Sequence, residues 1–578
     1  MDRRSFLKSA GMSAAGTAFA TDIFAEAAEK GSTSPQFLSG TNRDRSQIQS
    51  TDLTPWAPSA AQPWDVHTIN HLYRRAGFGA SLAEIAIAQG KNYSDVVDGL
   101  LNDAFLTQPT DPAIPGYSAD TNTRPSWLHV PPYVYTPFGI NVMLADYAIA
   151  NMKVASHWTV QMNHPDTMLR EKFTLFWMNH FAVESKKAVY PQYMYGFLTY
   201  FRNNAWGNFK KMVSDVSIQP AMLSYLDGVL NVGTNPNENY ARELQELFTM
   251  GVTDQNGKAN YTQDDVEALA KVFSGWTIDL QAPPPNILPP LYNPSLHNSS
   301  YLSIYDGSQK LVYNLSSSGA AKDMDIIDHI FTMRGNQIAW YICSKLYQYF
   351  VYHDISGTAE QSVIQAMATL FQNSNWEIKP VISALLKSAH FFDEANIGAG
   401  IKSPIEHLLG LVHAFDIQID ELAGGSIVYY AIAGNQQLLD PPNVKGWPGY
   451  HSWISTTTLP YRNEISGGLL ISQTLNLFTS VQDGYSNNLK PVLMPTDTVL
   501  LNSWAKLFTN YSGTFDDMLS ELATYLCAHT PSATALAYVK AQFPSATYEW
   551  ALLDDMTKVG ALRVMAAAIM QLADFQLC

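Results

Sequence analysis

Apolar residues recur at helical spacing along most of the chain. In residues 167–184 the large apolar side chains fall on one face of a helix, at Leu169, Phe173, Phe176, Trp177 and Phe181. The same spacing predicts a long helical region after residue 137 and further helices over 237–250, 262–276, 325–331, 337–351, 359–372, 379–388, 405–415 and 558–575. The pattern therefore predicts an all-α, mainly helical fold.

Polar residues mark where several of these helices begin. Asp65 precedes an apolar run that starts at residue 66, and Ser81 stands three positions before Glu84. Thr262 and Asp265 have the same spacing. A short polar side chain followed three residues later by an acid satisfies the free N–H groups of a first helical turn. We expect helices to start at all three places.

Two segments interrupt the helical pattern. Residues 281–319 contain Pro283-Pro284-Pro285 and many Asn and Ser, with a β-prone run at 311–313 that predicts a small hairpin. Residues 440–453 are rich in Pro, Gly and Trp. No internal repeat is visible, so we expect one large helical domain over 64–578 with these two irregular insertions.

The first residues read as an export signal. Arg3-Arg4-Ser5-Phe6-Leu7-Lys8 matches the core of a twin-arginine signal, and Ala18-Phe19-Ala20 has the small-x-small pattern of a cleavage site. We therefore expect a signal peptide at 1–20, a flexible tether at 21–63 and a mature protein in the periplasm or outside the cell. No later run of eighteen apolar residues occurs, so no stable membrane insertion is expected after signal removal.

The amino-acid composition excludes some classes of function for this protein. The chain has 578 residues and a formal net charge of -16, and only 15% of its residues are charged. Such an acidic chain, whose basic residues gather only in pairs, is repelled by nucleic acid and by anionic membranes. Cys343, Cys527 and Cys578 are too widely spaced to predict a zinc site or a redox pair. We expect no nucleic-acid partner.

Six segments, taken in order, resemble one bacterial family, domain of unknown function 1800. They are His71–Gly79, Leu169–Phe181, Asn237–Gly251, Tyr261–Trp276, Lys402–Glu406 and Pro441–Gly449, followed by Trp453 and Arg462. The resemblance implies a single α-helical domain and an exported protein. It also implies an exported partner from a second family, domain of unknown function 1501, which is similar to phosphatases and sulfatases. It implies no catalytic residues.

Charged side chains cluster on two of the predicted helices. Arg170, His180 and Glu184 lie near one face of the first, and the second carries Glu238, Arg242, Glu243 and Glu246. We take Arg170, His180, Glu184, Glu238, Arg242 and Glu243 as candidate catalytic residues. His180, Glu243 and Glu246 are candidate ligands of a divalent metal. The alternative is a buried network of ion pairs that ties the helices together.

The irregular segments supply a second candidate site. Asn443, Trp447 and Trp453 lie in the Pro- and Trp-rich loop, and His297 lies in the other insertion. Flat aromatic faces on a rigid loop suit a sugar or an aromatic ligand. The alternative is a loop that closes one end of the domain with its tryptophans in the core.

These features leave three functions open. The first is an exported enzyme acting on an extracytoplasmic substrate through a His/Glu/Arg site between helices. The second is a non-catalytic binding or assembly partner of another exported protein. The third is a cofactor-bearing oxidoreductase, which only the export route suggests.

Overall fold

The computed structural model describes residues 45, 48, 50–102, 141–188, 190–279, 289–298, 302–305, 310–311, 319–472, 474–475 and 490–578. The expected signal peptide at 1–20, the first part of the expected tether and most of 281–319 lie outside the described residues.

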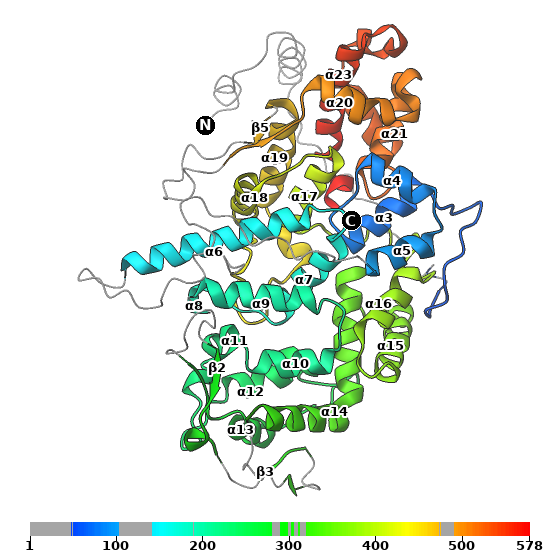
Figure 1. Cartoon of the computed structure of the whole chain (residues 1–578). Coiled ribbons are helices and arrows are strands. Elements are labelled where there is room, and N and C mark those ends of the chain that lie inside the picture. Colours follow the sequence, from blue (N-terminus) through cyan, green and yellow to red (C-terminus); the bar gives the residue numbers. More distant parts are fainter. Residues whose placement is uncertain are drawn as a thin grey trace.

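Helices form most of the described chain (Figure 1). In the N-terminal half they are α3 (Val66–Ala76), α4 (Leu82–Gln89), α5 (Tyr93–Leu101), α6 (Asn141–Met162), α7 (Met168–His180), α8 (Ser185–Ala188), α9 (Pro191–Asn203), α10 (Phe209–Ser217), α11 (Pro220–Tyr225), α12 (Asn239–Glu243) and α13 (Gln263–Val272). In the C-terminal half they are α14 (Gly319–Phe350), α15 (Thr358–Asn373), α16 (Ile378–Lys387), α17 (Pro404–Ala414), α18 (Glu421–Ala433), α19 (Thr458–Ser472), α20 (Asp497–Ser503), α21 (Phe515–Leu526), α22 (Ala533–Lys540) and α23 (Asp555–Ile569). Among the described helices, none has both the length and the hydrophobicity to cross a bilayer.

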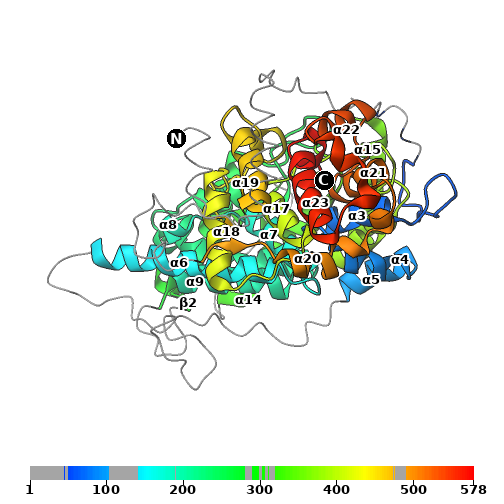
Figure 2. The ribbon, with the colours of Figure 1, turned by 90° about the horizontal axis from the view of Figure 1, so that it is seen from above.

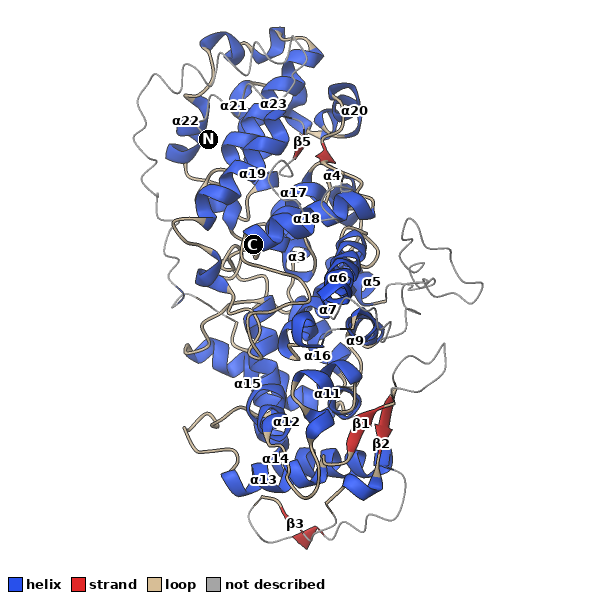
Figure 3. Ribbon diagram, turned by 90° about the vertical axis from the view of Figure 1, so that its left-hand side faces the viewer, coloured by secondary structure: helices blue, strands red, loops and turns tan. Residues whose placement is uncertain are grey.

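The strands are few and short (Figure 3). They pair as three antiparallel two-stranded sheets: β1 (Trp276–Ile278) with β2 (Pro290–Tyr292), β3 (Leu302–Ser303) with β4 (Lys310–Leu311), and β5 (Thr474–Leu475) with β6 (Val492–Leu493). The mainly helical fold predicted from the sequence is confirmed. The β3–β4 pair lies within the first insertion, and β2, also in the insertion, pairs with β1 just before it.

The helices group around one continuous hydrophobic core that includes residues from Trp56 to Phe575. Helices α10 to α15 lie at one end of the molecule and α19 to α23 at the other (Figure 1). Between them, α18 packs along α6, and α17 lies beside α18 (Figure 2). Segments distant in sequence therefore meet in the middle of the fold.

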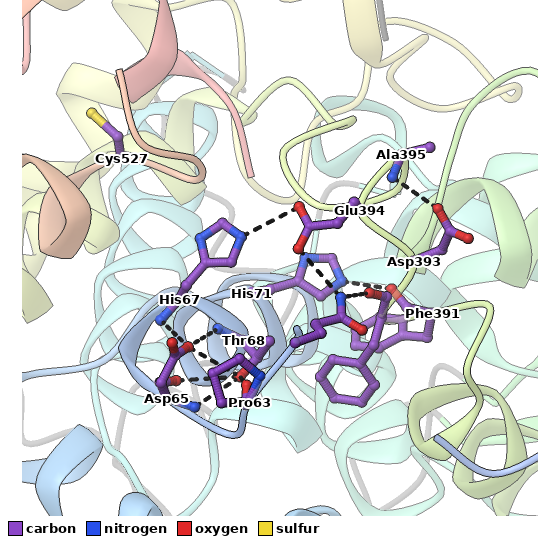
Figure 4. Close-up of polar contacts among 12 residues, drawn as sticks. Pro63, Asp65, His67, Thr68, His71, Phe391, Asp393, Glu394, Ala395 and Cys527 are labelled. Atoms are coloured by element: carbon purple, nitrogen blue, oxygen red, sulfur yellow. Dashed lines mark hydrogen bonds and ion pairs between the residues drawn. The ribbon is translucent and has the colours of Figure 1, made fainter. Parts of the chain in front are cut away.

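All three predicted helix starts are present. Asp65, Ser81 and Thr262 each accept a hydrogen bond from the backbone of the first turn, and in each the side chain at the third helical position bonds back. Helix α3 is also held from outside, because His71 Nε2 donates to the Phe391 carbonyl at 2.9 Å (Figure 4). His67 on the same helix lies 3.7 Å from the Glu394 carboxylate.

Three helix boundaries differ from the prediction. Helix α7 ends at His180, so His180 and Glu184 do not share a helix, and the expected i, i+4 pair does not exist. The expected helix over 237–250 is α-helical only to Glu243 and continues as a π-helix, η4 (Leu244–Thr249). The two helices expected over 325–351 are one helix, α14, with a kink at Arg334.

The expected tether also packs on the domain over its second part. The Trp56 side chain is buried and its backbone N–H donates to the Lys387 carbonyl at 2.8 Å. Arg45 Nη2 forms an ion pair with Glu360 at 2.9 Å. The prediction of a flexible tether up to residue 63 is therefore wrong for this part, because one buried tryptophan outweighs the surrounding Ser and Pro.

Candidate acid–base site

Four segments distant in sequence meet near Glu243: the end of α7, the stretch from α12 through η4, the start of α13 and the loop at 440–447. The loop contacts α7 directly, since Trp447 N–H donates to Asn179 Oδ1 at 2.6 Å. Gly446 has a φ of +79°, and a Cβ at this position would lie 2.2 Å from Asn179 Oδ1. Only glycine fits this contact.

The π-helix η4 provides backbone carbonyl groups at the site. Its wider turn leaves carbonyl groups that other elements use: His180 Nε2 donates to the Phe248 carbonyl at 3.0 Å, and the Tyr341 hydroxyl donates to the Leu247 carbonyl at 3.1 Å. A Cβ added to Gly251, just after η4, would lie 2.9 Å from the Tyr341 ring. π-Helical turns are uncommon and occur often at functional sites.

Glu243 is the carboxyl group with the most unusual environment here. It is half-buried, and among the described residues no hydrogen bond or ion pair engages it. Burial raises the pKa of this carboxyl, and the neighbouring Glu246 carboxylate raises it further, against smaller opposing effects of Lys445 and Arg242. Such a group holds its proton to a higher pH than an ordinary glutamate.

Two other carboxylates of the site are bound by tyrosines. The Tyr261 hydroxyl donates to Glu246 Oε2 at 3.2 Å, and the Tyr225 hydroxyl donates to Glu184 Oε1 at 2.9 Å. Burial, Glu246 and this hydrogen bond raise the pKa of Tyr261 to about 12. Burial and the Glu184 carboxylate also raise the pKa of Tyr225, so both hydroxyls stay protonated as donors at neutral pH.

His180 lies behind this group in the core, with its ring among those of Phe176, Phe181 and Phe209. Burial lowers the pKa of His180 to about 3, and the nearby Lys345 ammonium contributes. The imidazole is therefore neutral and donates from Nε2, while its buried Nδ1 has no hydrogen-bond partner. It positions η4 rather than carrying protons.

The expected metal ligands do not form a metal centre. Among the residues that the structure describes, no three His, Cys, Asp or Glu side chains are placed to hold a metal ion. His180 uses Nε2 on a backbone carbonyl, whereas Glu243 and Glu246 lie near each other with Tyr261. The two glutamates lie close enough for the charge of Glu246 to act on the pKa of Glu243.

The sequence family described as a protein of unknown function, DUF1800, matches residues 71–577. The chain belongs to the DUF1800 family. Nothing among the curated proteins or the solved structures matches it. Parts of four of the segments that carry the resemblance to DUF1800 meet near Glu243.

The remaining charged candidates of this DUF1800 protein lie elsewhere. Arg170 Nη1 donates to the Arg202 carbonyl at 2.7 Å, and its guanidinium lies 4.5 Å from the centre of the Trp206 ring. Next to it the buried Glu171 pairs with Arg202 at 2.8 Å. This buried ion pair involves none of the candidate carboxylates, so it differs from the network expected as the alternative.

Glu238 and Arg242 form an i, i+4 ion pair at 2.8 Å on the surface of α12. Both side chains are more than a third exposed, and Gln263 bonds to each of them. An exposed pair of this kind contributes little to stability. Arg242 still lies close enough to act on the pKa of Glu243.

The candidate ligand-binding residues do not share one place. Trp447 and Trp453 are buried in the core, as expected for a loop that closes the domain. Asn443 is exposed and its Oδ1 accepts the Lys445 N–H at 2.9 Å. His297 bonds through Nδ1 to the Ser274 carbonyl at 2.7 Å, beside β1 and β2.

Three members of the site were not among the sequence candidates: Tyr225, Tyr261 and Lys445. Tyr261 directly precedes the helix cap Thr262, and Lys445 lies in the Pro/Trp loop, so both stood within segments that the resemblance marks. Tyr225 had no sequence signal, since its contact with Glu184 depends on the packing of α11 against α8.

Proposed function

We propose that this DUF1800 protein is an exported hydrolase that uses Glu243 as a general acid on an extracytoplasmic polymer. The observation that carries the proposal is the half-buried, unpartnered Glu243 carboxyl, whose pKa is raised by burial and by Glu246. A carboxyl group whose pKa is raised and that lies next to a second carboxylate is a common feature of acid–base catalysts.

The two glutamates suit hydrolysis of a bond with an oxygen leaving group, such as the link between two sugars. Glu243 would donate its proton to the leaving oxygen, and the Glu246 carboxylate would accept a proton from the attacking water. Hydrolysis breaks the bond between the two sugars and adds the elements of one water molecule to the two new chain ends. Glu246 then releases its proton to solvent and Glu243 takes one up, which restores both groups. Tyr261 would hold Glu246 in place through its hydrogen bond.

The test is release of new reducing ends from purified extracytoplasmic polysaccharides. Glu243→Gln keeps the shape of the side chain but holds no acidic proton, so activity should fall by about 100-fold or more, as for loss of a general acid. Glu549→Gln is the matched control, because Glu549 is exposed in the C-terminal part of the chain. Equal activity in the E243Q variant and the wild type would refute the proposal.

Export is a separate part of the proposal and rests on Arg3 and Arg4. Replacing both arginines with lysine keeps the charge but removes the twin-arginine signal, so the protein should accumulate in the cytoplasm in folded form. Cell fractionation measures this directly. If the lysine variant still reaches the periplasm, the protein does not depend on the twin-arginine route.

One observation favours the assembly role as a second candidate. The Pro/Trp loop buries its tryptophans but exposes Pro442, Asn443 and Pro448. This rigid exposed edge suits a protein partner, and an exported DUF1501 protein is the one that the resemblance suggests. The test is copurification of the protein with an exported DUF1501 protein. If Asn443→Ala weakens this copurification and Glu243→Gln leaves it unchanged, the assembly role is supported.

A further inference from the structure

A second group of charges lies in the middle of the fold, where α3, the segment before α17, α19 and the C-terminal residues meet. It consists of five cationic side chains, none more than 8% exposed: Arg74, Arg75, Lys172, Lys402 and Arg462. Figure 1 shows the C-terminal end beside α3, and Arg75 Nη1 contacts Cys578 Sγ at 2.9 Å. We call this group the buried cationic cluster.

The positive charge of the cluster is largely unbalanced. Of the five side chains, only Lys172 has an ion pair within the described part of the chain, and its partner is Glu406. Burial alone would raise the pKa of Glu406, but Lys172 lowers it to about 2, so this carboxyl is charged. Burial and the neighbouring Arg74 lower the pKa of Lys402 to about 7, so Lys402 is only partly protonated at neutral pH. The cationic side chains of the cluster still outnumber its carboxyl group. Isolated buried charges are costly unless a counter-charge accompanies them.

Hydrogen-bond donors in the cluster are also unsatisfied. Arg462 donates from Nε to Gln576 Oε1 at 2.7 Å, but its buried Nη1 and Nη2 have no hydrogen-bond partner in the part of the chain that the structure describes. Lys402 Nζ donates to the Phe575 carbonyl at 2.7 Å, which uses one of its three N–H groups. Buried donors without acceptors are rare in folded proteins and point to a missing acceptor.

A small cavity lies beside Lys402, whereas Arg462 is not among its lining residues. Its volume is about 20 Å³, and Arg74 and Lys402 are among its lining residues, together with Asn70, Phe78, Tyr525 and Phe575. The lining residues include neither Asp nor Glu. A cavity of this size holds one particle of the size of a water molecule.

Arg74 is held at the cavity by two backbone carbonyls. Its Nη2 donates to the Tyr525 carbonyl at 2.6 Å, and its Nη1 donates to the Cys527 carbonyl. Lys402 is held over the Phe575 ring, with Nζ 3.9 Å from the ring centre. Both cations are therefore fixed before any ligand arrives.

We propose that this cavity binds a small inorganic anion of the size of chloride between Arg74 and Lys402, with Arg462 and Arg75 adding positive potential. The anion would supply the negative charge and the hydrogen-bond acceptor that the cluster lacks. A larger oxyanion such as phosphate exceeds the cavity. The site is independent of Glu243 and of the proposed hydrolysis.

The test is thermal unfolding of the full chain at fixed ionic strength, with chloride replaced stepwise by gluconate. Wild type should melt a few degrees higher in high chloride, because a ligand that binds only the folded state stabilises it. In Lys402→Met the chloride dependence should disappear. Lys558→Met is the control, since Lys558 is equally buried but lies over Tyr511 and should leave the chloride effect intact.

A second measurement needs no variant. Crystals soaked in bromide should give an anomalous peak in the cavity beside Lys402. A melting temperature independent of chloride, or a bromide-free cavity that holds only water, would overturn the proposal. A phosphate effect without a chloride effect would also overturn it.

Discussion

At the scale of single residues, burial shifts the pKa values of Glu243 and His180 in opposite directions. Burial disfavours the charged form of any group. For Glu243 this raises the pKa and keeps a proton on the carboxyl, whereas for His180 it lowers the pKa to about 3 and keeps the ring neutral. The glutamate is thus suited to donating a proton, and the histidine is suited to a permanent hydrogen bond.

The neutral state of His180 predicts a loss of stability in acid. The histidine takes up a proton near pH 6.5 when unfolded but only near pH 3 when folded. Between these values the unfolded state binds more protons, so the free energy of unfolding falls as pH falls, by about 1.4 kcal/mol per pH unit for one such group.

His180→Gln should reduce this pH dependence. Glutamine can still donate to the Phe248 carbonyl but takes up no proton in this range. Urea unfolding at pH 7.5 and pH 5.0 measures the difference between wild type and variant. If both lose the same free energy on acidification, His180 is not held neutral in the folded protein.

At the scale of elements, the Pro/Trp loop is fixed to α7 through Gly446. Gly446→Ala adds a Cβ that would meet Asn179 Oδ1 at 2.2 Å, in a backbone conformation with φ of +79°. We expect a loss of stability of at least about 1–2 kcal/mol. Denaturant unfolding measures it.

The matched control for this change is Gly560→Ala in α23. A Cβ at Gly560 meets nothing within 4 Å, and alanine favours a helix over glycine by about 1 kcal/mol. The control should be neutral or stabilising. If the G446A variant behaves like the control, the loop is not held against Asn179.

Several helix positions followed from local signals in the sequence. The caps at Asp65, Ser81 and Thr262 depend on side chains within three residues, and all three were predicted. Helices α5, α10 and α18 were not predicted, although Asn92 and Asn208 cap the first two. In α18, Gly424-Gly425 near the start is a pattern typical of a break. Gly424 allows close packing, because a Cβ there would lie 2.7 Å from Thr159 Oγ1 of α6.

The candidate site was predictable only in part, because only some of its contacts are between residues close in sequence. Glu243 and Glu246 stand three positions apart in the sequence, so their closeness could be predicted. The end of α7 at His180, the π-helix after Glu243 and the approach of Lys445 all depend on contacts between distant segments. No periodicity in the sequence carries that information.

At the scale of the whole molecule, the chain before α3 is part of the fold. Trp56 stacks on Phe392 with ring centres 4.3 Å apart and meets Tyr93 edge-on at 5.1 Å. Its Nε1 donates to Gln62 Oε1 at 2.8 Å. This segment thus connects α5 with the residues after α16.

Trp56→Ala should therefore cost about 3–5 kcal/mol of stability, as for other buried tryptophans. Trp56→Phe keeps the ring contacts and should cost less. Thermal unfolding compares the two variants with wild type. If the W56A variant has the same melting temperature as wild type, this segment is not part of the folded domain.

The charge of the molecule is divided between surface and interior. The chain carries a net charge of -16, yet five cationic side chains lie buried together in its middle. The acidic groups are thus mostly outside, where water screens them. This separation is consistent with the anion site proposed above.

The pKa of the Glu243 carboxyl tests the central claim most directly. It can be measured by ¹³C NMR titration of glutamate-labelled protein, with Glu243→Gln to assign the signal. We predict a pKa above that of ordinary glutamates in wild type and a lower pKa in Glu246→Gln, which removes the neighbouring charge. A Glu243 carboxyl that titrates like an exposed glutamate, or that does not respond to E246Q, would contradict the account.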